Sequence, residues 1–477
     1  MQLVSRLLLI RNYILLIVIV LYTPILTIGI FNYPGKWQIY VVFSIVFILF
    51  FCVGFYGRIS VFYVILSSFW LLGFPLKVAL KLIFGSLYTE PVGSFDYSGL
   101  DYDRALIVST CGFLGALIAR IIDINKSIII KYNNNIYNIK LLKIIDWPVY
   151  IFMVLMICFI NYYLQIFQIG VQSKNILPFH LNIFFFWFIS IGAPAWLSFI
   201  LLDFDHNTRG YDRNNLSMAL IIISTFLISI SILSRQPFIF FAGPFAAVFI
   251  MNAWGRNELC LKSLIKYIVL FIGSMVIALL VVATLRAKLY NVSNGIQPQS
   301  QSSTQSQSSS SMVFIKQNAS LLLDRWIGFE GVAAVSSFKG LDWVLMWDAV
   351  KEPVSSGSDG IFQVISKSPF AGKNEASKSG FLFGSEPGII GFSFFAGNFI
   401  FTIAFIFVLV RLIIFIERLT FYLLDKNEYF TIFFGLVMAN VMMQFTSPIM
   451  TIKFFIEICI TVMIMVLYNF LNKRVKN

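Results

Sequence analysis

The chain has 477 residues, of which 59% are hydrophobic and only 12% are charged, with a formal net charge of +13. Soluble domains carry about 25% charged residues, so this composition excludes an ordinary soluble protein. The apolar runs are continuous rather than alternating, which predicts membrane-spanning α-helices and excludes a barrel of alternating strands. Lys and Arg collect in the cytoplasmic loops of membrane proteins, so the positive charge does not indicate nucleic-acid binding.

About twelve stretches are long and apolar enough to cross a hydrocarbon core about 30 Å thick. The first is expected to remain in the protein, because no small-residue cleavage site follows it. The stretches give an N-terminal transmembrane bundle at 1–285, a large loop at 286–386 and C-terminal transmembrane helices at 387–477. We predict spans at 13–31, 37–56, 61–84, 105–122, 147–169, 182–202, 217–234, 238–254, 265–285, 387–414, 429–446 and 449–469.

The distribution of basic residues orients these spans. With the N-terminus inside, the inside loops and termini hold many Lys and Arg and the short outside loops hold few, whereas the opposite orientation reverses this asymmetry. Both termini are therefore expected in the cytoplasm, with the large loop outside. The inside set includes Arg120, Lys143, Arg256, Arg411 and Arg418.

The large loop has two parts. Residues 294–311 are almost entirely Gln and Ser, which offer little apolar surface to bury, so this part is predicted to be disordered. Residues 312–386 carry enough aromatic and aliphatic side chains for short helices packed on the membrane surface, among them Trp326, Trp343 and Trp347.

Several cations lie at the outer edge of the predicted membrane region. Arg235 follows the seventh span, Arg286 and Lys288 follow the ninth, and Arg325 lies in the loop beside Asp324. Guanidinium groups bind phosphate oxygens through paired hydrogen bonds and stay charged, so this set suits a diphosphate. The alternatives are side chains that reach the interface from helix ends, or a surface ion pair of Arg325 with Asp324 or Glu330.

Two lysine motifs lie within predicted spans. Lys77 and Lys81 share one helical face: either the third span stops near Pro75 and an amphipathic interfacial helix follows, or the two side chains point into a polar cavity. Lys453 and Glu457 also share a face, either as a buried ion pair or with Lys453 in an anion site near the outer surface.

Three external carboxylates are candidates for acid–base chemistry: Asp324, Glu330 and Glu386. A carboxylate near hydrocarbon can have a raised pKa and then accept a proton near neutral pH. Glu330 ranks first because of its apolar surroundings in the sequence. A second acidic set, Asp96, Asp101 and Asp103, is only a weak indication of a metal site. The chain has five cysteines, no C-x-x-C pair and two histidines, so neither a zinc site nor a disulfide framework is predicted.

Three stretches prompt a comparison with a known family: SRQPF at 234–238, RWIGFEGVAAVSS at 325–337 and EPGIIGFSFFAGN at 386–398. With about twelve spans and one large external loop in the C-terminal half, the chain resembles the Wzy-type O-antigen or oligosaccharide repeat-unit polymerases. The resemblance implies a GT-C-like, metal-independent glycosyltransferase without a cofactor. It also implies work at the periplasmic face of the bacterial inner membrane, on undecaprenyl-diphosphate-linked oligosaccharides.

The resemblance also implies residue roles. The family's external arginines are thought to hold the diphosphate, and that role maps by position onto Arg235, Arg286 and Arg325. When the cations and carboxylates named above are added, the predicted catalytic residues are Glu330 and Arg325. The predicted diphosphate-binding residues are Arg235, Arg286, Arg325, Lys288, Lys453, Lys77 and Lys81. Membrane lipids, a chain-length regulator and a flippase are the expected partners, and no metal is expected.

Two other functions stay open. An O-antigen ligase shares the loop architecture, but ligases tend to carry a functional His in the external loop, and this loop has none. A lipid-linked oligosaccharide flippase or other transporter fits twelve spans, but transporters usually place their substrate site near the membrane midplane.

Overall fold

The computed structural model describes most of the chain. The described residues are 20–57, 59–124, 147–169, 175–207, 211–255, 261–294, 328–352, 360–368 and 386–474, apart from positions 21, 86, 89, 176, 425 and 446.

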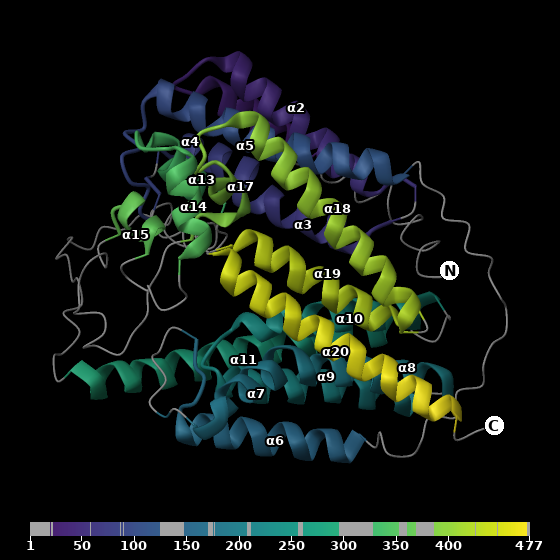
Figure 1. Cartoon of the computed structure of the whole chain (residues 1–477). Helices are drawn as coiled ribbons and strands as arrows, with labels where there is room; N and C mark the ends of the chain where they lie inside the picture. Colours follow the sequence, from purple (N-terminus) through teal and green to yellow (C-terminus); the bar gives the residue numbers. More distant parts are fainter. Residues whose placement is uncertain are drawn as a thin grey trace, which may run out of the picture.

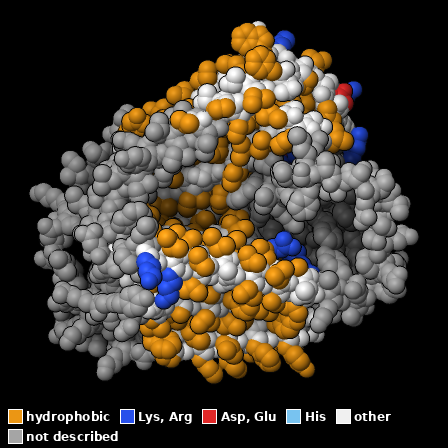
Figure 2. All heavy atoms as spheres, turned by 180° about the vertical axis from the view of Figure 1, so that it is seen from behind, with side chains coloured by type: hydrophobic (Ala, Val, Ile, Leu, Met, Phe, Trp, Pro, Cys, Tyr) orange, Lys and Arg blue, Asp and Glu red, His pale blue; other side chains and the backbone are white. Residues whose placement is uncertain are grey.

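Every regular element in these residues is a helix, which agrees with the predicted helical membrane protein. Eight helical stretches of the described part are long and apolar enough to cross a membrane: Trp37–Gly54, Val61–Phe84, Gly99–Ile124, Trp147–Leu164, Leu181–Phe204, Asn214–Ser231, Leu264–Arg286 and Phe399–Leu423. Three shorter apolar helices span Tyr22–Phe31, Phe238–Ala253 and Glu428–Met443. Apolar side chains cover most of the described surface in Figure 2, as a lipid environment requires.

One group of helices lies at the top of Figure 1, where α5 packs against both α2 and α18. A π-helical segment, η1, joins α3 to α4 without a break and contains Pro75, which has no amide hydrogen to donate. The group comprises α2 (Trp37–Gly54), α3 (Val61–Leu71), η1 (Leu72–Leu76), α4 (Lys77–Phe84), α5 (Gly99–Ile124) and α18 (Phe399–Leu423).

A second group lies at the bottom of Figure 1, where α9 contacts α6 and α11. It also contains two π-helical segments, η3 and η4. Its members are α6 (Trp147–Leu164), η2 (Pro178–His180), α7 (Leu181–Trp187), η3 (Phe188–Gly192), α8 (Ala193–Asn207), α9 (Tyr211–Ser231), η4 (Phe238–Ala242), α10 (Gly243–Gly255) and α11 (Leu261–Asn294).

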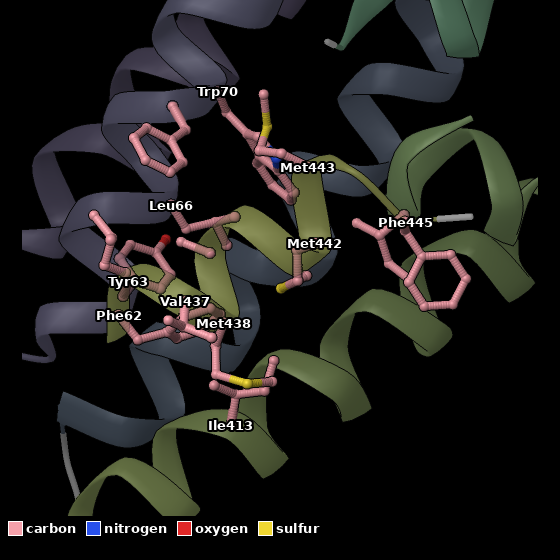
Figure 3. Close-up of a cluster of buried hydrophobic side chains, with 14 of the residues drawn as sticks. Phe62, Tyr63, Leu66, Trp70, Ile413, Val437, Met438, Met442, Met443 and Phe445 are labelled. Carbon is pink, nitrogen blue, oxygen red and sulfur yellow. The ribbon is translucent and has the colours of Figure 1, made fainter. Parts of the chain in front are cut away.

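Helix α19 (Glu428–Met443) connects the two groups, because it contacts α3 on one side and α8, α10 and η4 on the other. Figure 3 shows the apolar cluster at the α3 side, with Leu66 and Trp70 of α3 beside Val437 and Met442 of α19. Helix α20 (Pro448–Arg474) follows α19 along the chain.

Four short helices belong to the large loop or follow it: α13 (Phe329–Ser337), α14 (Trp343–Lys351), α15 (Ile361–Ile365) and α17 (Gly388–Ser393). We call the end of the molecule that carries α13, α14 and α15 the loop end; it lies at the left of Figure 1, and the C-terminal end of α20 lies opposite, at the right. Short helices in this part of the loop were predicted, and the structure confirms them.

The predicted tenth span, 387–414, has the wrong start. Residues 388–393 form the separate helix α17, and the long helix α18 begins only at Phe399. The side chain of Asn398 accepts a hydrogen bond from the Phe401 amide at 3.1 Å and so caps the start of α18. At the other side of the loop, α11 continues to Asn294, beyond the predicted end of its span at 285.

A cluster of arginines around Asp123 joins α5 to α18 at the end opposite the loop end. The buried Asp123 carboxylate accepts hydrogen bonds from Arg120 at 2.8 Å and Arg411 at 3.0 Å, and it also pairs with Arg418. Arg120 donates a further bond to the Tyr56 carbonyl, just beyond α2, at 2.8 Å. One carboxylate thus ties together three segments that are distant in the sequence.

Glu417 makes a second connection at the same end. Its carboxylate accepts the amides of Val61 at 2.6 Å and Phe62 at 3.1 Å, and it contacts the Ser60 hydroxyl. These are the unpaired donors of the first turn of α3, so a side chain of α18 caps α3.

We expect Asp123→Asn to lower the free energy of unfolding by about 3–5 kcal/mol, because it leaves three clustered guanidinium groups without their buried anion. Denaturant unfolding of the detergent-solubilised protein measures this loss. The matched control is Asp348→Asn on the exposed side of α14, which should leave stability unchanged. Equal stability of the two variants would contradict the role given to Asp123.

Candidate functional site

Lys77 and Glu330 form a buried ion pair between α4 and the loop helix α13. Lys77 is 0% exposed and Glu330 is 2% exposed. Glu330 lies in the first turn of α13, where the helix dipole favours a negative charge. The helical stretch continues past Pro75 to Phe84, and Lys77 lies within it in a buried ion pair, not among the residues that line the cavity described below.

Lys81 lies one turn further along α4 and is also buried. Its ammonium group donates to the Leu87 carbonyl at 2.9 Å and lies 5.8 Å from the centre of the Tyr88 ring. Tyr88 and Tyr102 pack in turn on Phe329, with ring centres 5.6 Å and 6.1 Å away. This aromatic cluster fixes the start of α13 directly beside the ion pair.

Two glycines let α13 approach its neighbours closely. A Cβ atom at Gly328 would lie 2.5 Å from the Gly73 carbonyl oxygen in η1, and one at Gly331 would lie 2.4 Å from the Pro387 carbonyl oxygen and 2.8 Å from that of Glu386. Helix α13 is therefore wedged between η1 and the Glu386–Pro387 segment. Glu330 and Glu386 consequently belong to neighbouring parts of one region.

A cavity of about 480 Å³ lies between the second helix group and α19 and α20, with Glu386 in its wall. This volume falls in the range of small-molecule sites, roughly 300–1,000 Å³. Two π-helical segments contribute to the wall, Ile189 and Ser190 from η3 and Phe240 and Phe241 from η4. Irregular turns of this kind occur frequently at functional sites. The other lining residues are Phe167, Gln168, Ile169, Phe186, Ile232, Gln236, Pro237, Val437, Asn440, Val441, Gln444, Thr451, Lys453 and Phe454.

Side-chain amides form much of the polar part of this wall. Gln444 accepts long hydrogen bonds from Gln236 at 3.5 Å and from Asn440 at 3.4 Å. Sequence reasoning missed these residues. Asn440 and Gln444 could have been recognised as candidate site residues, because they are polar and one helical turn apart in a segment that is otherwise apolar.

Arg286 binds the turn between α9 and η4, on which Arg235 lies. Arg286 donates to the Leu233 carbonyl at 2.7 Å and to the Ile169 carbonyl at 3.1 Å. Arg235 is exposed, two residues after Leu233 and directly before the cavity residue Gln236. Arg286 thus holds the turn that carries Arg235 beside the cavity.

The structure describes only some of the other predicted site residues. Lys453 lines the cavity with an exposed side chain, while Glu457 is buried one turn along α20. Arg325, Asp324 and the side chain of Lys288 lie outside the described residues.

The three loop tryptophans are also only partly described. Trp343 and Trp347 are 56% and 59% exposed on α14, and Trp343 packs edge-on against Phe401 at 4.8 Å. Trp326 lies outside the described residues.

The acidic group before α5 has a structural explanation. Asp103 accepts the Tyr33 hydroxyl at 2.8 Å and the Lys36 amide at 3.0 Å, and Asp101 accepts the Asp96 amide at 2.9 Å. The described residues hold no group of three or more acidic, His or Cys side chains that could hold a metal ion.

Glu386 has the most unusual environment in the cavity wall. Its Oε2 atom is buried and accepts no hydrogen bond from the described residues. Burial raises the pKa of Glu386 to about 8, and the nearby Glu90 adds a smaller contribution in the same direction. A carboxyl group with such a pKa changes charge close to physiological pH.

Comparison of the chain with protein-family models, with curated proteins and with solved structures gives no match. The function must therefore be argued from the residues and their arrangement.

We expect Lys77→Met to lower the free energy of unfolding by about 3–5 kcal/mol, because the Glu330 carboxylate loses its buried partner. The double variant Lys77→Met/Glu330→Met should recover most of this loss, since two apolar side chains replace the pair. Denaturant unfolding in detergent measures both, with the exposed Lys351→Met as the control. Additive losses in the double variant would show that the pair is not a coupled unit.

Proposed function

We propose that the chain is a metal-independent glycosyltransferase that polymerises undecaprenyl-diphosphate-linked oligosaccharide repeat units into surface polysaccharide, either O-antigen or capsule. It would act at the periplasmic face of the bacterial inner membrane. The observation that carries this proposal is the cavity with Lys453 and Glu386 in its wall and Arg235 beside it. The resemblance of the three sequence motifs to the Wzy-type polymerases supports the same function.

The proposal includes a GT-C-like fold with about twelve spans, both termini in the cytoplasm and the loop end facing the periplasm. The eight long apolar helices, the three shorter ones and α20 would supply that number of crossings. The short apolar helices beside the cavity fit a site at the membrane edge, where a lipid-linked substrate presents its head group.

The composition of the cavity wall suits a lipid-linked diphosphate. Its phenylalanines, among them Phe240 and Phe454, offer an apolar surface to the lipid, and Lys453 offers positive charge to the diphosphate. The amides of Gln236, Asn440 and Gln444 can exchange their long mutual contacts for hydrogen bonds to sugar hydroxyls or phosphate oxygens.

The reaction needs little chemistry from the protein, because a sugar joined to diphosphate is already activated. An acceptor hydroxyl of one repeat unit attacks the anomeric carbon of the donor chain, the new glycosidic bond forms, and the bond to the diphosphate oxygen breaks. The hydroxyl proton passes to a base, and the lipid diphosphate leaves as an anion that Lys453, Arg235 and Arg325 would stabilise.

The buried ion pair has a positioning role in this proposal. Lys77, Lys81 and Glu330 do not line the cavity, and Glu330 is 2% exposed in contact with Lys77. These residues hold α13 against η1 and against the Glu386–Pro387 segment. They thereby keep the start of α13 beside Glu386 in the cavity wall. Arg286 likewise holds the turn that carries Arg235.

Deletion of the gene in its host, followed by gel analysis of the surface glycan, tests the proposed function. A ladder that collapses to core plus one repeat unit would establish a polymerase, because flipping and ligation would continue. Loss of every repeat unit would instead indicate a ligase or a flippase.

We expect Arg235→Ala and Lys453→Ala each to lower kcat/KM for polymerisation roughly 10- to 150-fold. This is the loss of one hydrogen bond to a charged group, about 1.5–3 kcal/mol. Complementation of the deletion strain gives the chain-length distribution, and immunoblotting of membranes gives the protein level. The control is Lys351→Ala on α14, away from the cavity, and wild-type chains in both test variants would contradict the assignment.

A further inference from the structure

Glu386 is placed where substrate and base would meet. It lines the cavity that also contains Lys453, and it precedes Pro387 and the short helix α17. Its backbone is held against Gly331 of α13, so the position of its side chain depends on a packed contact and not on a loose loop. A base must lie within hydrogen-bonding reach of the substrate hydroxyl, which makes cavity lining the first requirement.

The Glu386 carboxyl group is also uncommitted. Its buried Oε2 atom accepts no hydrogen bond from the described residues, whereas the Glu330 carboxylate is engaged by Lys77. A buried polar atom without a partner carries a desolvation penalty of about 1–3 kcal/mol, which a substrate hydroxyl donating to it would remove. Glu330 differs from Glu386 in position: it does not line the cavity, and its Oε1 atom is paired with Lys77.

We propose that Glu386, and not Glu330, is the general base that removes the proton from the acceptor hydroxyl; this inference rests on the proposed function. As the hydroxyl oxygen attacks the anomeric carbon, its proton moves to the Glu386 carboxylate and the bond to the lipid diphosphate breaks. The carboxyl group then releases the proton to water, which returns it to the ionised form for the next acceptor.

The charged groups around Glu386 set the pH at which it works. Glu90, from the segment before α5, raises the pKa of Glu386 beyond what burial alone causes, to about 8. Glu330 on α13 is neutralised by Lys77, and Lys453 of α20 faces the same cavity. Because a base must be ionised to accept a proton, the rate rises with pH through about 8 and levels off above it.

The test uses the purified full-length chain in liposomes with an undecaprenyl-diphosphate-linked repeat unit, and it compares pH profiles of kcat. We expect Glu386→Gln to lower kcat about 10²- to 10⁴-fold and to abolish the pH-dependent rise, with KM and thermal stability preserved. Glu330→Gln leaves Lys77 without its buried ionic partner, so it should lower thermal stability and activity, but its pH profile should retain the wild-type midpoint. Glu90→Gln should move the midpoint to lower pH, because it removes a negative charge near Glu386.

The outcomes separate this inference from the proposed function. Turnover by the wild type together with an unchanged pH profile in Glu386→Gln would overturn only the assignment of Glu386. Loss of the pH-dependent rise in Glu330→Gln alone would return the role to Glu330. Absence of turnover in the wild type with lipid-diphosphate donors would overturn the glycosyltransferase, and the base with it.

Discussion

The buried contact between Lys77 and Glu330 is the interaction on which the loop end depends. Removing two charges from water is expensive, and their mutual contact offsets part of that cost, so burial of α13 in the bundle favours the position that joins them. Through Gly331 that position also determines where the Glu386–Pro387 segment lies. A single pair therefore links the long apolar helical stretch Val61–Phe84, the large loop and the wall of the cavity.

The two ends of the molecule handle charge in different ways. Around Asp123, three guanidinium groups share one carboxylate and join α5 to α18, so the charges there serve each other. At the loop end, Glu386 and Lys453 face a cavity instead. Charges that are satisfied within the protein hold structure, and charges directed at a cavity are available to a ligand. This contrast separates the structural arginines from the candidate site more clearly than their positions in the sequence do.

Hydropathy predicted most spans closely, because each span must satisfy its backbone internally and its length follows from the membrane. Hydropathy gave the wrong start for the predicted span 387–414, because the sequences of α17 and α18 are both apolar and follow each other closely. The Asn398 cap marks the start of α18. The buried ion pair of Lys77 was neither of the two predicted alternatives, because its partner Glu330 lies 253 positions away and no local pattern connects them. The cavity was not predictable, since Gln168, Gln236 and Gln444 come from three separate segments.

The π-helical segment η1 sets the direction in which the side chains after it point from the helix axis. Successive residues of an α-helix are rotated by about 100° around its axis, so a wider turn within a span shifts every later side chain around that axis. Lys77 is the first residue after η1, and its direction towards α13 therefore depends on the irregular turn at Leu72–Leu76. Loss of one residue from this segment would leave an apolar span of nearly the same length and hydropathy, yet it would turn Lys77 and Lys81 away from Glu330. The arrangement of charge at the loop end is encoded in the register of a span as much as in the identity of its residues.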